Sequence, residues 1–72
     1  MSKMAKYVYA FLAGEMTKKH LTAEDVGKII GINGRTLRNK LNGFTDFTWG
    51  EVCKINELFP SFSKEELFQR EP

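Results

Sequence analysis

The chain has 72 residues, of which 42% are hydrophobic and 28% charged, and a net charge of +2. This length and usage predict one globular domain over residues 1–72, and they exclude an enzyme fold that needs a large parallel sheet. A single cysteine, Cys53, excludes an internal disulfide, and with only one histidine beside it a zinc site is not expected. We expect no catalytic or cofactor site, no membrane span and a cytoplasmic location.

Charge is unevenly distributed along the sequence. Residues 1–43 carry eight basic and three acidic side chains, whereas residues 44–72 carry three basic and six acidic ones. Between Val26 and Gly43 there are four basic residues and no acid. Such asymmetry is typical of a protein with one face suited to an anion, although chance clustering on a solvated surface gives the same pattern in a short chain.

The first predicted element is a helix over about residues 3–18. Apolar residues recur there at the spacing of one helix face, at Met4, Tyr7, Val8, Phe11, Leu12 and Met16. Lys3 and Lys6 before this apolar stretch also resemble a signal peptide. Its removal would leave about 55 residues without a disulfide, so we favour the helix.

Three further helix starts follow one plan, in which a hydroxyl residue is followed three positions later by an acid and preceded by an apolar residue. These capping boxes begin at Thr22, Thr48 and Ser63. They predict helices over about 23–30, 49–59 and 64–69, and another helix, over about 34–42, starts near Asn33. Gly31, Gly43 and Pro60 supply the stops. The sequence therefore predicts an all-α domain of five helices.

The second and third helices are separated only by Gly31-Ile32-Asn33, which is typical of a helix-turn-helix. Ile32 can fill the space between these helices, and Gly27 is small where they approach each other. The predicted core comprises Tyr7, Phe11, Leu12, Val26, Ile30, Leu37, Leu41, Phe47, Val52, Ile55 and Leu58.

The third helix has a polar face opposite its apolar one. At about 100° per residue, Arg35, Arg38, Asn39 and Asn42 fall within an arc of about 100°, away from Leu37 and Leu41. Arginine pairs bidentately with guanine and asparagine with adenine in the major groove. A solvated polar face is the alternative, but the tight turn before this helix favours DNA reading.

The segment from Leu21 to Gly43, with Val26, Ile30-Gly31-Ile32 and Asn42-Gly43, resembles the Cro and lambda-repressor type of helix-turn-helix, the Xre family. Asp46-Phe47-Thr48 and the helix after it are similar to the fourth helix of temperate-phage repressors. The resemblance implies a compact five-helix domain of this type. It also implies a Cro-like phage or prophage repressor in a bacterial host cell, which places its third helix in the major groove of an operator in double-stranded DNA.

The resemblance also implies roles for single residues. The base-reading positions are Asn33, Gly34, Arg35, Arg38 and Asn39. The phosphate-contacting positions are Thr22, Thr36, Asn42 and Gly43, to which we add the basic residues Lys28 and Lys40. Four positions depart from the family pattern. Gly27 stands where alanine is more common, and Gly34 brings no side chain to a place that often holds glutamine or arginine. Lys40 stands where many relatives have an apolar residue, and Ala23 cannot make the side-chain phosphate contact that a glutamine would.

One recognition helix contacts few bases, so we expect a homodimer on a near-palindromic operator. We place its surface on the last two helices, around Phe59, Phe62 and Phe68. The alternative function is a helical protein-interaction module of antitoxin or anti-repressor type with little DNA binding. Trp49 is expected to be partly buried, Cys53 to be a packing residue and His20 to lie in a solvated loop.

Overall fold

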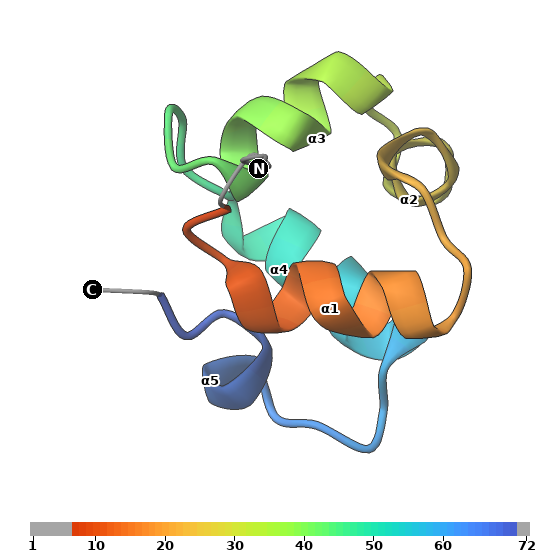
Figure 1. Cartoon of the computed structure of the whole chain (residues 1–72), viewed down its shortest axis with the longest axis vertical. Helices are drawn as coiled ribbons and strands as arrows, with labels where there is room; N and C mark the ends of the chain where they lie inside the picture. The colour runs from red at the N-terminus through yellow and green to blue at the C-terminus, as the bar shows by residue number, and fades with distance from the viewer. Residues whose placement is uncertain (1–6, 71–72) are drawn as a thin grey trace, which may run out of the picture.

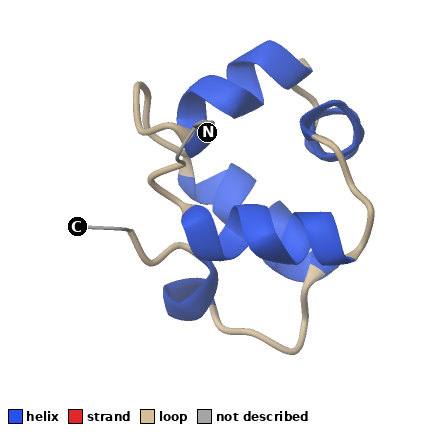
Figure 2. Ribbon diagram, viewed as in Figure 1, coloured by secondary structure: helices blue, strands red, loops and turns tan. Residues whose placement is uncertain are grey.

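A computed structural model describes residues 7–70 of the chain. It contains the helices α1 (Ala10–Lys18), α2 (Ala23–Ile30), α3 (Gly34–Leu41), α4 (Trp49–Leu58) and α5 (Lys64–Leu67). The described part holds no strand (Figure 2), which confirms the predicted all-α class and its five helices. None of the helices in this part is long and apolar enough to cross a membrane.

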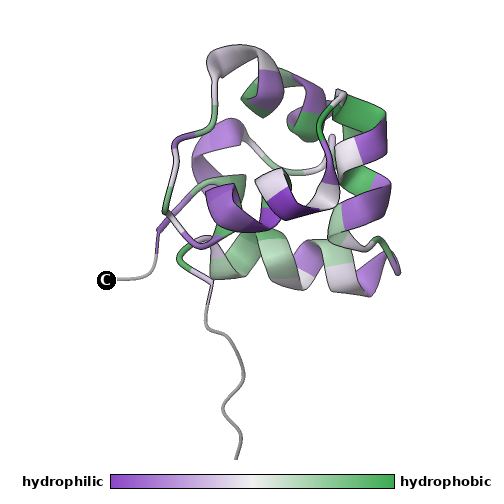
Figure 3. Cartoon of the chain, turned by 90° about the horizontal axis from the view of Figure 1, so that it is seen from above, coloured by the Kyte–Doolittle hydropathy of each residue, from purple (hydrophilic) through white to green (hydrophobic). Residues whose placement is uncertain are grey.

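The helices surround one core. In Figure 1, α1 crosses the front of the molecule with α4 behind it, and α3 lies above them in the plane of the view while α2 is seen end-on. Hydrophilic and hydrophobic residues alternate along the helices (Figure 3), as amphipathic helices around a shared core require.

The structure confirms the three predicted capping boxes. At each one the cap hydroxyl accepts a hydrogen bond from the backbone N–H three residues on, and the acid at that position accepts one from the backbone N–H of the cap residue. Gly31 and Gly43 have positive φ angles of 92° and 84°, so both supply the left-handed conformation that ends a helix segment. Local sequence therefore sets where α2, α4 and α5 begin and where α2 stops.

The first helix is shorter than predicted. It begins at Ala10 rather than near residue 3, and residues 3–6 lie outside the described part. The Tyr9 N–H donates to the carbonyl oxygen of Leu41 at 3.2 Å. This bond ties the segment before α1 to the end of α3, so its backbone does not continue the helix.

The buried core consists of Tyr9, Leu12, Met16, Val26, Ile30, Leu37, Leu41, Ile55, Phe59 and Leu67. Six of these were predicted. Tyr7, Phe11, Phe47 and Leu58 were also predicted, and they are only partly buried against the core. The predicted Val52 is half-buried and does not belong to the core. Tyr9, Met16, Phe59 and Leu67 were missed.

The predicted dimer surface is reduced, because one of its three aromatic side chains, Phe59, belongs to the core and the other two, Phe62 and Phe68, are only partly exposed. Phe59 is only 2% exposed. Phe62 meets Phe11 edge to face with ring centroids 5.2 Å apart, and Phe68 meets Phe47 at 5.0 Å. These rings attach the C-terminal segment to the rest of the core, and Phe62 and Phe68 keep part of their surface exposed.

Trp49 also differs from expectation, because its side chain is 70% exposed rather than partly buried. It is the first residue of α4 and lies outside the core. The Lys64 ammonium lies 5.5 Å from the centre of its ring, so the indole is flanked by a cation and not by core residues.

Candidate nucleic-acid interface

The turn between α2 and α3 is tightly closed. The backbone N–H groups of Gly31 and Ile32 both donate to the carbonyl oxygen of Gly27, at 2.7 and 2.8 Å. A Cβ atom at Gly27 would lie 2.5 Å from the carbonyl oxygen of Ile32. The absent side chain at position 27 therefore allows the turn to approach α2, as the sequence predicted.

The third helix buries and exposes the predicted faces. Leu37 and Leu41 are 0% and 1% exposed. On the other side, Arg35 is exposed, the Arg38 side chain is 40% exposed, and Asn39 is half-buried. The polar groups that can read base edges thus lie on the side of α3 away from the core.

Two predicted contact residues also cap helices. Asn33 is exposed and its Oδ1 accepts from the Thr36 N–H at 2.7 Å, while the exposed Thr22 hydroxyl accepts from the Asp25 N–H at 3.1 Å. The side-chain amide N–H groups of Asn33 and the hydroxyl hydrogen of Thr22 are donors that these caps do not use. Both residues can therefore cap a helix and still donate to DNA.

Lys28 is exposed on α2, where its ammonium can meet a phosphate. At the C-terminal end of α3, by contrast, the backbone N–H groups already have partners. The Gly43 N–H donates to the carbonyl oxygen of Lys40 at 3.0 Å, and the Asn42 N–H to that of Arg38 at 2.9 Å. The backbone amides here bond within the chain, so any phosphate contact at this end falls to the Asn42 side chain.

Lys40 does not occupy the predicted phosphate-contacting place. It is 9% exposed, and its ammonium donates to the carbonyl oxygen of Asp46 at 2.8 Å and pairs with Glu51 Oε1 at 3.1 Å. The side chain points past the core boundary toward α4, because that is where the carboxylate lies. Lys40 thus joins the end of α3 to the start of α4.

The environment of Glu51 lowers its pKa. Burial raises the pKa of this carboxyl, but the hydrogen bond from the Thr48 backbone N–H and the Lys40 ammonium lower it further than burial raises it. The net result is a pKa below the ordinary value of 4.5. A carboxyl with a depressed pKa in the folded state stabilises the fold above its unfolded pKa, and that stabilisation is lost as the pH falls through the folded pKa.

We therefore expect Glu51→Gln to destabilise the protein more at pH 7 than at pH 3. Denaturant titrations across this range measure the difference in the free energy of unfolding between variant and wild type. Glu57→Gln, an exposed change on the same helix, is the control. A Glu51→Gln deficit that stayed constant across the range would contradict the ion pair as its cause.

An acid that the sequence pattern did not predict lies at this surface. Glu24 of α2 forms an ion pair with Arg38 of α3. Nη1 of Arg38 donates to Oε2 of Glu24 at 2.8 Å, and Nη2 donates to the same oxygen. Glu24 lies two residues before the acid-free stretch and on another helix, so helical spacing could not connect it to Arg38. The capping box at Thr22 placed Glu24 in the first turn of α2, and this was the one signal in the sequence that bore on the position of Glu24.

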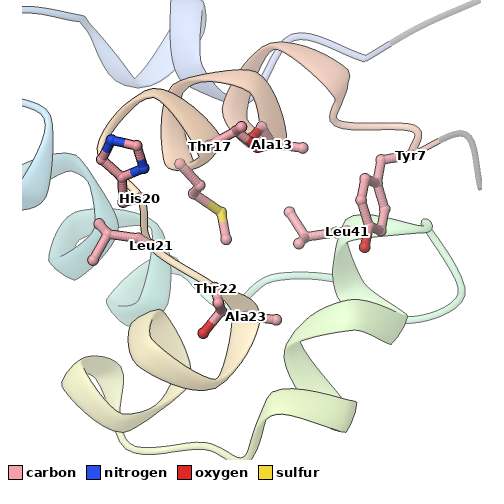
Figure 4. A pocket seen from close by; sticks show the side chains of 9 residues that line it. Tyr7, Ala13, Thr17, His20, Leu21, Thr22, Ala23 and Leu41 are labelled. Carbon is pink, nitrogen blue, oxygen red and sulfur yellow. The ribbon is translucent and has the colours of Figure 1, made fainter.

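A hollow of about 460 Å³ lies between α1, α2 and the end of α3 (Figure 4). Its lining is mostly apolar, and the side chains in it that carry polar groups are Tyr7, Thr17, His20 and Thr22. The Thr17 hydroxyl donates to the carbonyl oxygen of Ala13 at 3.0 Å. His20 is exposed in the connection between α1 and α2, and its φ angle is 59°. Among the described residues, no lysine or arginine lines the hollow, so it lacks the positive charge that would hold a nucleic-acid phosphate, and it is not the candidate site.

Within residues 7–70, no group of three or more His, Cys, Asp or Glu side chains could hold a metal ion. Cys53 is a half-buried free thiol in α4. Comparison of the chain with protein-family models, curated proteins and solved structures finds no significant match.

Proposed function

We propose that the chain is a sequence-specific DNA-binding protein that inserts α3 into the major groove. The observation that carries this proposal is the outward face of α3, where Arg35, Arg38 and Asn39 lie opposite the buried Leu37 and directly after a tight turn. Side chains of these types can recognise guanine and adenine through the edges that the major groove presents.

The surface around this face supports binding to the DNA backbone. Lys28 is exposed on α2, and Thr22 is exposed at the N-terminus of the same helix, where the helix dipole favours an anion. Contacts of this kind fix the position of the protein on DNA without reading sequence. The function is then that of a regulator, and the resemblance to Cro-type repressors makes repression of a phage or prophage operator its proposed form.

Two copies on a near-palindromic operator remain part of the proposal, because a single short helix contacts few bases. Half-sites would be separated by about 34–36 Å, one turn of DNA. Phe59 is buried and does not supply the contact between copies, whereas the partly exposed Phe62 and Phe68 remain its proposed place. Footprinting at saturation would show paired half-sites, and a single unpaired half-site would count against two copies.

Binding to random DNA and to a sequence obtained by selection, at two salt concentrations, tests the function. Neutralisation of phosphates by basic side chains makes affinity fall steeply with salt, and base reading adds a preference for the selected sequence. Weak, salt-insensitive binding with no preferred sequence would overturn the proposal.

Arg38→Ala should weaken binding to the selected sequence by about 1–3 kcal/mol and relax preference at one base pair. Lys28→Ala should weaken binding to all sequences alike and reduce the salt slope by about one, because it removes a phosphate contact. Competition binding measures both effects, after circular dichroism has shown that each variant is folded. An unchanged ratio of selected to random affinity in folded Arg38→Ala would remove Arg38 from the base readers.

A protein-interaction module is the second candidate, and one observation favours it. Phe44, in the connection between α3 and α4, and Trp49, the first residue of α4, are 76% and 70% exposed. Exposed aromatic side chains are enriched where proteins bind each other. If this candidate is correct, substitution of both by serine would abolish partner binding, and the wild type would bind DNA only weakly.

A further inference from the structure

We propose that Glu24 is a positioning residue that holds Arg38 for the recognition of guanine. The inference rests on the proposed DNA binding and adds to it a specificity determinant outside the recognition helix. Glu24 touches no base in this scheme. It acts through the guanidinium of Arg38.

The geometry of the pair leaves free the N–H groups with which Arg38 would bind guanine. Both terminal nitrogens of the guanidinium bond to a single oxygen, Oε2 of Glu24. A guanidinium carries five N–H groups in a planar fork, so these two bonds leave three N–H groups, including that of Nε. Guanine presents O6 and N7 to the major groove and needs only two of them. The carboxylate therefore fixes the plane of the guanidinium without using up its donors.

The place that Glu24 occupies depends on Gly34. A Cβ atom at Gly34 would lie 2.8 Å from Cγ, Cδ and Oε2 of Glu24. Gly34 is the first residue of α3, where the helix dipole favours a carboxylate. The missing side chain at position 34, which on its own removes a base contact, thus makes room for the acid that orients Arg38.

The pair favours a matched sequence over random DNA for two physical reasons. An arginine side chain that is already held loses less conformational freedom when it meets a base. The negative charge of Glu24 also offsets the attraction of Arg38 for phosphates, which are present on every sequence. Binding to the matched sequence then gains from Arg38 while binding to random DNA gains little.

The test compares the ratio of selected-sequence to random affinity among variants of the whole chain. Glu24→Asp keeps the charge and shortens the side chain, and we expect it to lower the ratio about three- to tenfold with little change in random affinity. Glu24→Ala should lower the ratio equally and also raise random affinity. Glu65→Ala, which removes an exposed acid from the same position of α5, should leave the ratio unchanged.

The loss should fall on the base pair that Arg38 reads. A repeated selection with Glu24→Asp should relax the same position that Arg38→Ala relaxes, and Glu24→Asp should have no further effect on the ratio in the Arg38→Ala background. Gly34→Ala supplies an independent variant, because it displaces Glu24 without changing any charge. We expect it to reproduce the Glu24→Asp ratio.

Wild-type ratios in Glu24→Asp and Gly34→Ala would overturn the inference and leave the proposed function standing. Equal rises in affinity for both DNAs in Glu24→Ala, with an unchanged ratio, would show that Glu24 only masks charge, and would overturn it as well. A wild type that prefers no sequence would overturn the proposed function and this inference together. In the free protein, side-chain N–H signals of Arg38 should exchange more slowly in the wild type than in Glu24→Asp, and equal rates would contradict the holding role.

Discussion

Leu37→Ala should lower the free energy of unfolding by about 2–5 kcal/mol, the range for deletion of a large buried aliphatic side chain. Leu37 is 0% exposed and lies on the face of α3 that meets α2 and the rest of the core. The cost has two parts, the lost transfer of the side chain from water and the cavity left behind. A domain of this size has a total stability of only several kcal/mol, so the variant should be close to unfolding.

Chemical denaturation with a circular-dichroism readout measures this change. Arg35→Ala is the control, because Arg35 is two residues away on the exposed face of the same helix and should alter stability by less than about 0.5 kcal/mol. Similar losses in both variants would contradict the orientation of α3, and with it the assignment of Arg35 and Arg38 to the outward face.

The starts of the last four helices could be predicted from the sequence because the interactions that set them are local. Thr48 and Glu51 are three residues apart, and the bonds they exchange need no other part of the chain. The same holds for the left-handed glycine at position 31, whose conformation ends α2. Hydrophobic spacing likewise placed Leu37 and Leu41 on the buried face, since both belong to one helix.

The remaining features depend on residues far apart in the chain, which spacing along one helix does not reveal. The start of α1 is set by the bond from Tyr9 to Leu41. Lys40 turns away from the surface because Glu51 of α4 lies beside it. Phe59 was predicted to contact a second copy, because no residue near it in the sequence indicates that its side chain is buried.

The candidate site shows the same division. The polar arc of α3 follows from helical periodicity, whereas the pair between Glu24 and Arg38 joins residues 14 positions apart on two helices. Its formation depends on how the turn brings α2 against α3. The closeness of that approach is therefore the feature of the fold on which the site most depends.

Gly27→Ala tests this approach directly, and we expect it to destabilise the protein by about 1–3 kcal/mol, as overpacking does. The new Cβ would lie 2.5 Å from the carbonyl oxygen of Ile32 and 3.2 Å from the backbone carbon of Asn33. These are backbone atoms of the turn, so no side-chain rotation relieves the contact, and α2 and α3 must separate. Separation would also move Glu24 away from Arg38 and reduce DNA affinity.

Gly14→Ala is the matched control, because Gly14 also lies inside a helix but a Cβ there would meet nothing within 4 Å. Alanine is a better helix former than glycine by about 1 kcal/mol, so this variant should be more stable than the wild type. The same substitution thus has opposite expected signs at two helical glycines, and thermal denaturation of both variants measures them. If Gly27→Ala were stabilising too, the turn would have to be looser than the distance of 2.5 Å between the added Cβ and the Ile32 carbonyl oxygen implies. In that case α3 would not be held in one orientation relative to α2.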